Sequence, residues 1–167
     1  PIRLVELKQN SLKDQLETVQ LFVVDNFNTE VFSEEEIDAI EQWVYNGGIL
    51  IVGTGAYAEE ILSGMGDSVL GLECKRIYDP DEVKQYLQEQ GYDYDNVYDE
   101  WEYPYGDLVN YNIVHMAELN EIKGYQQYMT QYMSGAMTYS AGDGAIGVLR
   151  YSLSEIGKMG QDFYQNY

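Results

Sequence analysis

Two short apolar runs lie in the first third of the chain. Residues 19–25 read VQLFVVD and residues 49–52 read ILIV, and both runs are rich in β-branched residues. Nearly continuous apolar runs of this length are typical of strands buried on both faces of a parallel sheet. The sequence therefore predicts two central parallel strands, which should be neighbours because only a short crossover joins them.

A helix is predicted between these two strands. Ser33 and Glu36 have the spacing of a capping box, in which the two side chains satisfy free amides at a helix N-terminus. The apolar residues that follow recur at helical spacing, and Gly47 and Gly48 supply a stop. These signals place the helix at residues 34–45.

Further elements follow the second strand. The glycine-rich turn after residue 52 leads into a helix over residues 57–65, and another helix should run from Pro80 to Gln90. Less regular patterns predict a short helix or turn over residues 11–18, strands over 69–72 and 109–117, and two strands within 138–153 joined around 141–144. They also predict a last helix that Ser154 caps and that continues through Ile156, Met159 and Phe163.

The strands and helices predicted over residues 19–65 alternate along the chain. This order is typical of an α/β fold, in which right-handed crossovers build a mainly parallel sheet with helices on both faces. We therefore expect a single three-layer α/β domain over residues 1–167, with a strand-rich C-terminal part. The periodic pattern is lost over residues 92–107, which we expect to form a surface excursion.

The charge of the chain narrows the classes of partner. Lysine and arginine number 9 against 29 aspartate and glutamate residues, and the formal net charge is -20. A field of this sign opposes polyanions, so we expect neither nucleic acid binding nor direct contact with an anionic membrane surface. The chain starts at Pro1 rather than at a Met, and we expect it to be a piece of a longer protein.

The excursion at residues 92–107 concentrates aromatic side chains. From residue 93 it reads DYDNVYDEWEYPYGD. Because rigid amphipathic rings make good contact residues, Tyr98, Trp101 and Tyr103 are predicted to form a recognition surface for a protein or glycan that the sequence does not identify.

The same excursion carries acidic residues that could attract a cation. Asp93, Asp95 and Asp99 offer the oxygen atoms that Ca²⁺ prefers, but the spacing of a calcium-binding loop is absent. A solvated loop without a metal is the predicted state.

The chain resembles a known family over roughly half its length. The segment FVVDNFNTEVFSEEEIDAIEQWVYNGGILIVGTG, residues 22–55, is similar to class I glutamine amidotransferase-like domains, in the degenerate form found in extracytoplasmic parts of bacterial membrane-anchored proteins. The segment GDGAIGVLRYSLSE, residues 142–155, resembles the strand and turn that close such domains. The resemblance implies a flavodoxin-like α/β fold and an extracytoplasmic location.

The residues that make members of that family catalytic are missing. Active members place a nucleophilic Cys between small residues at a strand-to-helix turn and activate it with a downstream His-x-Glu. No glycine flanks Cys74, and Ala117 stands two positions after His115 where a Glu is needed. A direct pair of Cys74 and His115 is the remaining option, and nothing near either residue in the sequence activates it. We expect no catalytic activity.

A nucleotide site is the alternative interpretation of the turn after the second strand. Gly53, Gly55 and Ala58 form a GxGxxA string between a strand and a helix, and Glu73 ends the next apolar run, which together imitate a dinucleotide fingerprint. A tight turn explains the same glycines without a ligand.

Ligands of open α/β sheets usually bind at the carboxyl ends of the strands. The residues predicted to line a pocket there are Asp25, Asn26, Thr29, Gly53, Thr54 and Gly55. The alternative is that Asp25 and Asn26 only cap the turn that follows them. No cofactor is predicted.

Together these features favour a non-catalytic binding or scaffolding domain in the extracytoplasmic part of a bacterial surface or membrane-anchored protein. The rival hypothesis is a nucleotide-binding or hydrolase-like enzyme domain that uses the Gly53-Thr54-Gly55 loop.

Overall fold

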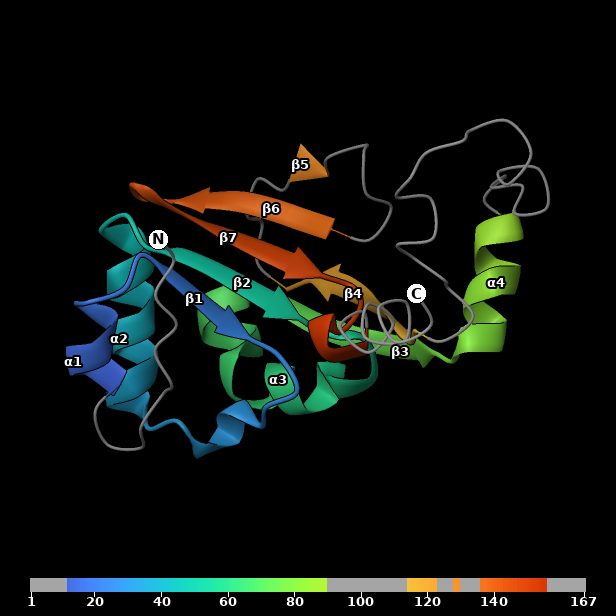
Figure 1. Ribbon diagram of the computed structural model, residues 1–167, viewed down its shortest axis with the longest axis horizontal. Coiled ribbons are helices and arrows are strands. Elements are labelled where there is room, and N and C mark those ends of the chain that lie inside the picture. The colour runs from blue at the N-terminus through green and yellow to red at the C-terminus, as the bar shows by residue number, and fades with distance from the viewer. Residues whose placement is uncertain (1–11, 90–113, 123–127, 130–135, 156–167) are drawn as a thin grey trace, which may run out of the picture.

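The two predicted strands form the first part of the main sheet. The computed structural model describes residues 12–89, 114–122, 128–129 and 136–155. Strand β1 (Leu21–Val24) pairs in parallel with β2 (Ile49–Gly53). Figure 1 shows the two strands side by side. The prediction of adjacent parallel strands is confirmed. The prediction that both strands are central is wrong for β1, which lies at the end of the sheet among the described strands, because an apolar run alone does not show whether a strand has a neighbour on each side.

A hairpin completes the main sheet. Strand β2 also pairs in parallel with β7 (Gly144–Leu149), and β7 pairs antiparallel with β6 (Ala136–Ala141) through a turn in which Gly142 has a φ of 61°. The short strand β5 (Tyr128–Met129) lies beyond β6, so the strand order is β1-β2-β7-β6-β5. The predicted pair of strands joined around residues 141–144 is confirmed, as is the strand-rich C-terminal part.

The helices lie close to their predicted positions. The labelled α-helices within the described residues are α1 (Leu12–Leu16), α2 (Glu34–Tyr45), α3 (Ala58–Met65) and α4 (Pro80–Glu89). Two 3₁₀ turns, η1 (Thr29–Val31) and η2 (Gly55–Tyr57), accompany them. The capping box at α2 is present, because Glu36 N donates to Ser33 Oγ at 3.3 Å and Ser33 N donates to Glu36 Oε2 at 2.9 Å. None of these helices has both the length and the apolar character needed to cross a membrane.

A second, smaller sheet stands apart from the main one. Strand β3 (Leu72–Tyr78) pairs antiparallel with β4 (Met116–Glu121), and these two strands form a sheet of their own. Of the strand predicted over residues 109–117, residues 109–113 lie outside the described part. His115 immediately precedes β4 instead of lying within it.

The strand predicted at residues 69–72 is wrong. A π-helical turn, η3 (Gly66–Leu70), contains Val69 and Leu70, and Gly71 ends the turn in the left-handed region with a φ of 63°. Of the predicted residues only Leu72 lies in a strand, as the first residue of β3. Val69 and Leu70 are buried in the core. The short apolar run therefore marks a buried helical turn, which hydrophobicity alone does not distinguish from a buried strand.

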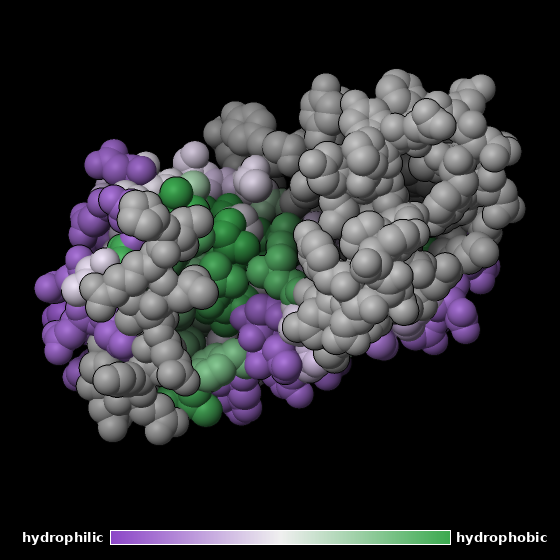
Figure 2. Space-filling view, viewed as in Figure 1, coloured by the Kyte–Doolittle hydropathy of each residue, from purple (hydrophilic) through white to green (hydrophobic). Residues whose placement is uncertain are grey.

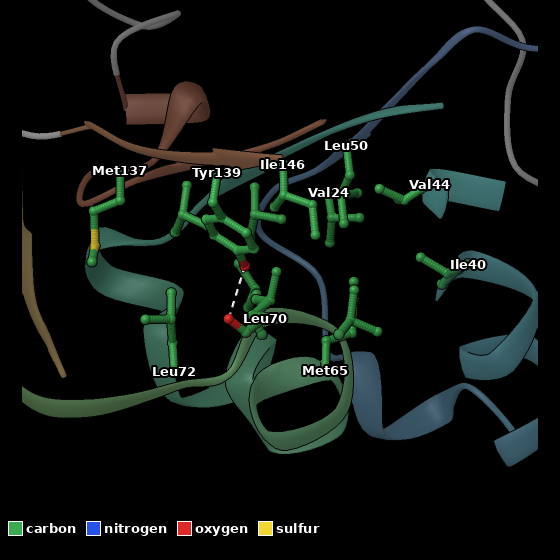
Figure 3. Packing of buried hydrophobic residues seen from close by; sticks show 14 of the residues in the cluster. Val24, Ile40, Val44, Leu50, Met65, Leu70, Leu72, Met137, Tyr139 and Ile146 are labelled. Atoms are coloured by element: carbon green, nitrogen blue, oxygen red, sulfur yellow. Dashed lines mark hydrogen bonds between the residues drawn. The ribbon is translucent and has the colours of Figure 1, made fainter. Parts of the chain in front are cut away.

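One apolar core lies between the main sheet and the helices. Alternate residues of a strand point to the same face, and on the core face Leu50, Val52 and Val148 are fully buried. Figure 3 shows side chains of this cluster, among them Val24, Ile40, Val44, Leu50, Met65, Leu70, Leu72, Met137, Tyr139 and Ile146. Residues of α2, α3 and η3 thus meet one face of the sheet.

Replacing Tyr139 with Phe is expected to lower the free energy of unfolding by about 1 kcal/mol. The buried hydroxyl of Tyr139 donates a hydrogen bond to the Leu70 carbonyl at 2.8 Å, which ties β6 to η3 (Figure 3). Urea unfolding followed by circular dichroism measures the change. The matched control is Tyr45→Phe on α2, where the side chain is exposed and the loss should be negligible. Equal midpoints for both variants would contradict the prediction.

On the opposite face of the main sheet, β1 and β2 carry exposed apolar side chains, whereas β6 carries the exposed polar residues Thr138 and Ser140. Leu21, Val23 and Ile49 are 52%, 47% and 44% exposed. The strand register places them on the same face as Ile51, Ala145 and Gly147. Figure 2 shows apolar surface over β1, β2 and β7. We call these six residues the open face.

The predicted fold class is confirmed. The chain has a mixed α/β fold whose main sheet contains three parallel strands, β1, β2 and β7, with helices packed against it. The described helices that contribute to the core lie on one face, so a helix layer over the open face stays a prediction.

Candidate functional site

Asp25 lies directly after β1, at the carboxyl ends of the parallel strands. Its Oδ1 accepts a hydrogen bond from Leu153 N at 2.9 Å, and its Oδ2 accepts from Ser154 N at 2.9 Å and from the Ser152 hydroxyl at 3.1 Å. Residues 153–155 form the first turn of a helix. Free amides at a helix N-terminus attract a carboxylate. Asp25 therefore anchors a helix start that lies 128 residues later in the chain.

Ser152, rather than Ser154, caps this helix. Ser152 is fully buried, and its Oγ accepts a hydrogen bond from Ser154 N at 3.1 Å. A cap residue precedes the first helical residue and its side chain accepts from an amide two or three positions on. The prediction that Ser154 is the cap is wrong by two positions, because two serines at this spacing offer the same local signal.

The turn after β2 packs closely against other segments of the chain. Thr54 is fully buried, and its hydroxyl donates to the Leu149 carbonyl at 2.7 Å. A Cβ atom at Gly53 would overlap Asp25 Oδ1, and one at Gly55 would lie 2.8 Å from the His115 carbonyl. Gly55 also has a φ of 59°. Intramolecular contacts therefore account for both glycines of the predicted nucleotide loop.

The side chain of Thr29 makes structural contacts with α3. It is fully buried, its hydroxyl donates to the Ile61 carbonyl at 2.6 Å, and it accepts a hydrogen bond from Gly64 N at 3.0 Å. These bonds fix η1 against α3. The hydroxyl group of Thr29 therefore already donates and accepts hydrogen bonds within the protein.

Capping of the following turn by Asp25 and Asn26 is also wrong. Asn28 performs that role, since its Oδ1 accepts from Glu30 N at 3.0 Å. Asn26 instead takes a left-handed backbone conformation, with a φ of 47°, which Asn tolerates better than most residues. It turns the chain away from β1 so that Asp25 can face the start of the last helix.

His115 and Glu155 form a pair at the same edge. His115 Nδ1 lies 2.7 Å from Glu155 Oε1, and His115 N donates to Glu155 Oε2 at 3.1 Å. The side chain of Glu155 is 11% exposed and that of His115 is 37% exposed. The pair joins the entry to β4 to the first turn of the last helix. No sequence signal predicts it, because 40 residues separate the partners.

Cys74 and His115 do not form a catalytic pair. Cys74 lies opposite Leu119 in the β3–β4 ladder, and His115 is four residues away from Leu119, which corresponds to about 13 Å of extended chain. Burial, followed by the nearby carboxylate of Glu59, raises the pKa of the Cys74 thiol. A raised pKa lowers the thiolate fraction near neutral pH. The expectation of an unactivated Cys74 agrees with this geometry.

The strand order does not form the dinucleotide-binding unit. That unit needs a second parallel strand beside the first, with an acidic residue at its end. The parallel neighbours of β2 are β1 and β7, whereas Glu73 lies on β3 in the separate antiparallel sheet. Glu73 therefore does not follow the turn in the way that the fingerprint requires.

A charged cluster lies on the small sheet. Lys75 Nζ donates to Glu118 Oε1 at 2.6 Å, and the Tyr78 hydroxyl donates to Glu118 Oε2 at 2.8 Å. These two hydrogen bonds, with that of Lys75 the stronger, hold the pKa of Glu118 below its ordinary value. All three side chains have a partner in the structure, so the cluster joins β3 to β4.

Replacing Glu118 with Gln should reduce stability near pH 7 by less than about 1 kcal/mol, because the pair is at the surface. The lowered pKa of Glu118 means that its contribution is present above the ordinary glutamate pKa of about 4.3 and is lost as the pH falls through the lowered value. Urea unfolding of both proteins should therefore give a difference near pH 7 that shrinks towards pH ~3. A difference that grows on acidification would have the wrong sign.

A groove lies at the opposite end of the sheet. Its volume is 740 Å³, and it is lined by residues of α1 and α2, by Val19 and Gln20 before β1, and by Gly47 and Gly48 before β2. Because parallel α/β folds bind ligands at the carboxyl ends of their strands, this groove is not the predicted pocket. Its lining combines the acidic residues Glu17, Glu35 and Asp38 with Lys13.

Several predicted site residues lie outside the described part of the chain. These are the recognition residues Tyr98, Trp101 and Tyr103, the calcium candidates Asp93, Asp95 and Asp99, and the rest of the excursion at 92–107. Among the described residues, no group of three or more His, Cys, Asp or Glu side chains could hold a metal ion.

Comparisons with known proteins give no family. No protein-family model and no curated protein matches the chain. Similar solved structures include the exo-β-1,4-mannosidase Op5Man5 from Opitutaceae bacterium strain TAV5, with a TM-score of 0.46 and 16% identity over 90% of this chain and 23% of that chain. Another is Gan42B, a GH42 β-galactosidase from G. stearothermophilus, with a TM-score of 0.43 and 14% identity over 92% of this chain and 22% of that chain. The chain thus spans less than a quarter of the length of either enzyme.

Proposed function

We propose that this chain is a non-catalytic binding or scaffolding domain of a bacterial surface or membrane-anchored protein. The observation that supports this most strongly is the engagement of Asp25, whose carboxylate accepts hydrogen bonds from Leu153 N, Ser154 N and the Ser152 hydroxyl. The polar group best placed to meet a ligand at the strand edge is thus used to hold the fold.

The neighbouring groups support the same conclusion. The hydroxyls of Thr29 and Thr54 bind backbone carbonyls, and the backbone on both sides of Thr54 is covered by Asp25 and by the His115 carbonyl. A phosphate at such a turn needs free amides and room for close approach. A catalytic cysteine needs a lowered pKa, whereas the pKa of Cys74 is raised.

The binding function is assigned to the excursion at residues 92–107. Its aromatic rings and acids suit contact with a protein or a glycan, and the net charge of -20 disfavours nucleic acid. The extracytoplasmic location and the anchor of the parent protein belong to the proposal and rest on the resemblance of residues 22–55 and 142–155 to amidotransferase-like domains of that kind.

A glycan array probed with the labelled chain tests the binding function. We expect saturable binding that the joint replacement of Tyr98, Trp101 and Tyr103 with Ala abolishes without changing the unfolding midpoint. The matched control is Tyr45→Ala, an exposed tyrosine on α2, which should bind like the unmodified chain. Glutamine hydrolysis or nucleotide hydrolysis above the level of a buffer blank would favour the enzyme hypothesis instead.

A further inference from the structure

The open face of the main sheet needs a cover. Leu21, Val23 and Ile49 leave between 44% and 52% of their surface exposed there. Among the described strands, β1 also lies at the end of the sheet, and its sequence LFVV has no charged residue or proline to protect that edge. Parallel sheets are normally covered on both faces, and exposed apolar patches mark contact sites.

A helix begins at the border of this face. Its first turn, residues 153–155, follows β7 closely and is held at the carboxyl ends of the strands by Asp25, by the Ser152 cap and by the pair of Glu155 with His115. Three independent contacts fix where this helix starts. The chain then has residues 156–167 left.

We propose that the open face is the docking site of residues 156–167, which continue this helix across β7, β2 and β1. Twelve helical residues extend about 18 Å, and three neighbouring strands span about 10 Å from the first to the third. The remaining chain therefore has the length needed to cross the sheet once.

The apolar pattern of the segment fits this surface. Ile156, Met159 and Phe163 recur at helical spacing on one side, with Gln161 and Asp162 on other sides. On the sheet, Ala145 and Gly147 of β7 are small, and they lie beside the bulkier side chains of β2. Small side chains on β7 allow a helix to approach the sheet closely.

The other occupants are less well supported. The described helical elements α2, α3 and η3 do not cover the open face, because they pack on the opposite face, where core residues such as Leu50 and Val148 are fully buried. A second copy of the chain would bring together two molecules that each carry a net charge of -20. A segment already attached at residue 155 has a high effective concentration at the face.

A double-mutant cycle in the full chain tests the proposal. Phe163→Ala should raise the equilibrium constant for unfolding at least about tenfold, because it removes a ring from an apolar contact. Val23→Ala on β1 is its partner, and Gln161→Ala is the matched control on the same segment, with an expected change of less than about twofold. In the double variant of Phe163→Ala and Val23→Ala, the increase in the equilibrium constant for unfolding should be smaller than the product of the two single increases by about threefold or more, since contacting residues couple. Should Phe163→Ala fail to fold, Met159→Ala takes its place in the cycle.

Three outcomes overturn the proposal. One is a neutral Phe163→Ala that behaves like Gln161→Ala, and another is multiplicative behaviour of both Phe163→Ala and Met159→Ala with Val23→Ala. The third is a second copy on the face, which sedimentation velocity would detect as a dimer that Val23→Ala dissociates and Phe163→Ala leaves intact.

Discussion

Replacing Asp25 with Ala is expected to lower the free energy of unfolding by about 3 kcal/mol. The change removes a carboxylate that accepts from Leu153 N, Ser154 N and Ser152 Oγ, and it leaves the Leu153 amide without its acceptor. Urea unfolding followed by circular dichroism measures the loss. We expect Asp25→Asn to lose less, because one amide oxygen still accepts a hydrogen bond.

Asp38→Ala supplies the matched control for Asp25. Asp38 lies exposed on α2, and removal of an exposed carboxylate should change stability by less than about 0.5 kcal/mol. An Asp25→Ala protein as stable as the control would show that the carboxylate does not anchor the last helix.

Replacing Gly53 with Ala is expected to lower the free energy of unfolding by about 2 to 3 kcal/mol. The added methyl group would overlap Asp25 Oδ1 and would lie 3.1 Å from Leu153 N, so it would push the carboxylate away from the amides that it binds. The same unfolding assay measures the effect.

A cycle with Asp25 separates this cause from the loss of a nucleotide site. If the clash with the carboxylate is the reason, Gly53→Ala should be much less harmful in a protein that already carries Asp25→Ala, because the obstructing oxygen is gone. Additive losses in the double variant would place the cause elsewhere in the turn.

The local elements of the fold could be predicted because their signals are local. The capping box at Ser33, the Asp79-Pro80 start of α4 and the glycine turn near Gly142 each act within a few residues, and each gave the correct element. The incorrect prediction of a strand at residues 69–72 also results from the use of local signals. Four apolar or small residues suit a buried strand and a buried helical turn equally, and tertiary packing decided between them.

The candidate site could be predicted only in its position. Parallel strands bring Asp25 and the turn at residues 53–55 to one edge, as the sequence indicates. What the side chains do there depends on partners such as Ser154 and Glu155, which are far away in sequence. A short-range capping signal explains Asn28 but cannot reveal that Asp25 accepts hydrogen bonds from the amides of a helix at the other end of the chain.

We propose that the chain itself closes the strand edge and that this edge binds no nucleotide. An amide titration of the ¹⁵N-labelled chain with ATP, and then with NAD⁺, tests it most directly, because phosphate binding at the turn would have to use its amides. With the edge closed, the resonances of residues 53–55, Leu153 and Ser154 should stay in place up to about 5 mM nucleotide, a concentration that detects even millimolar affinity. Saturable shifts of these resonances with one common Kd would contradict the claim.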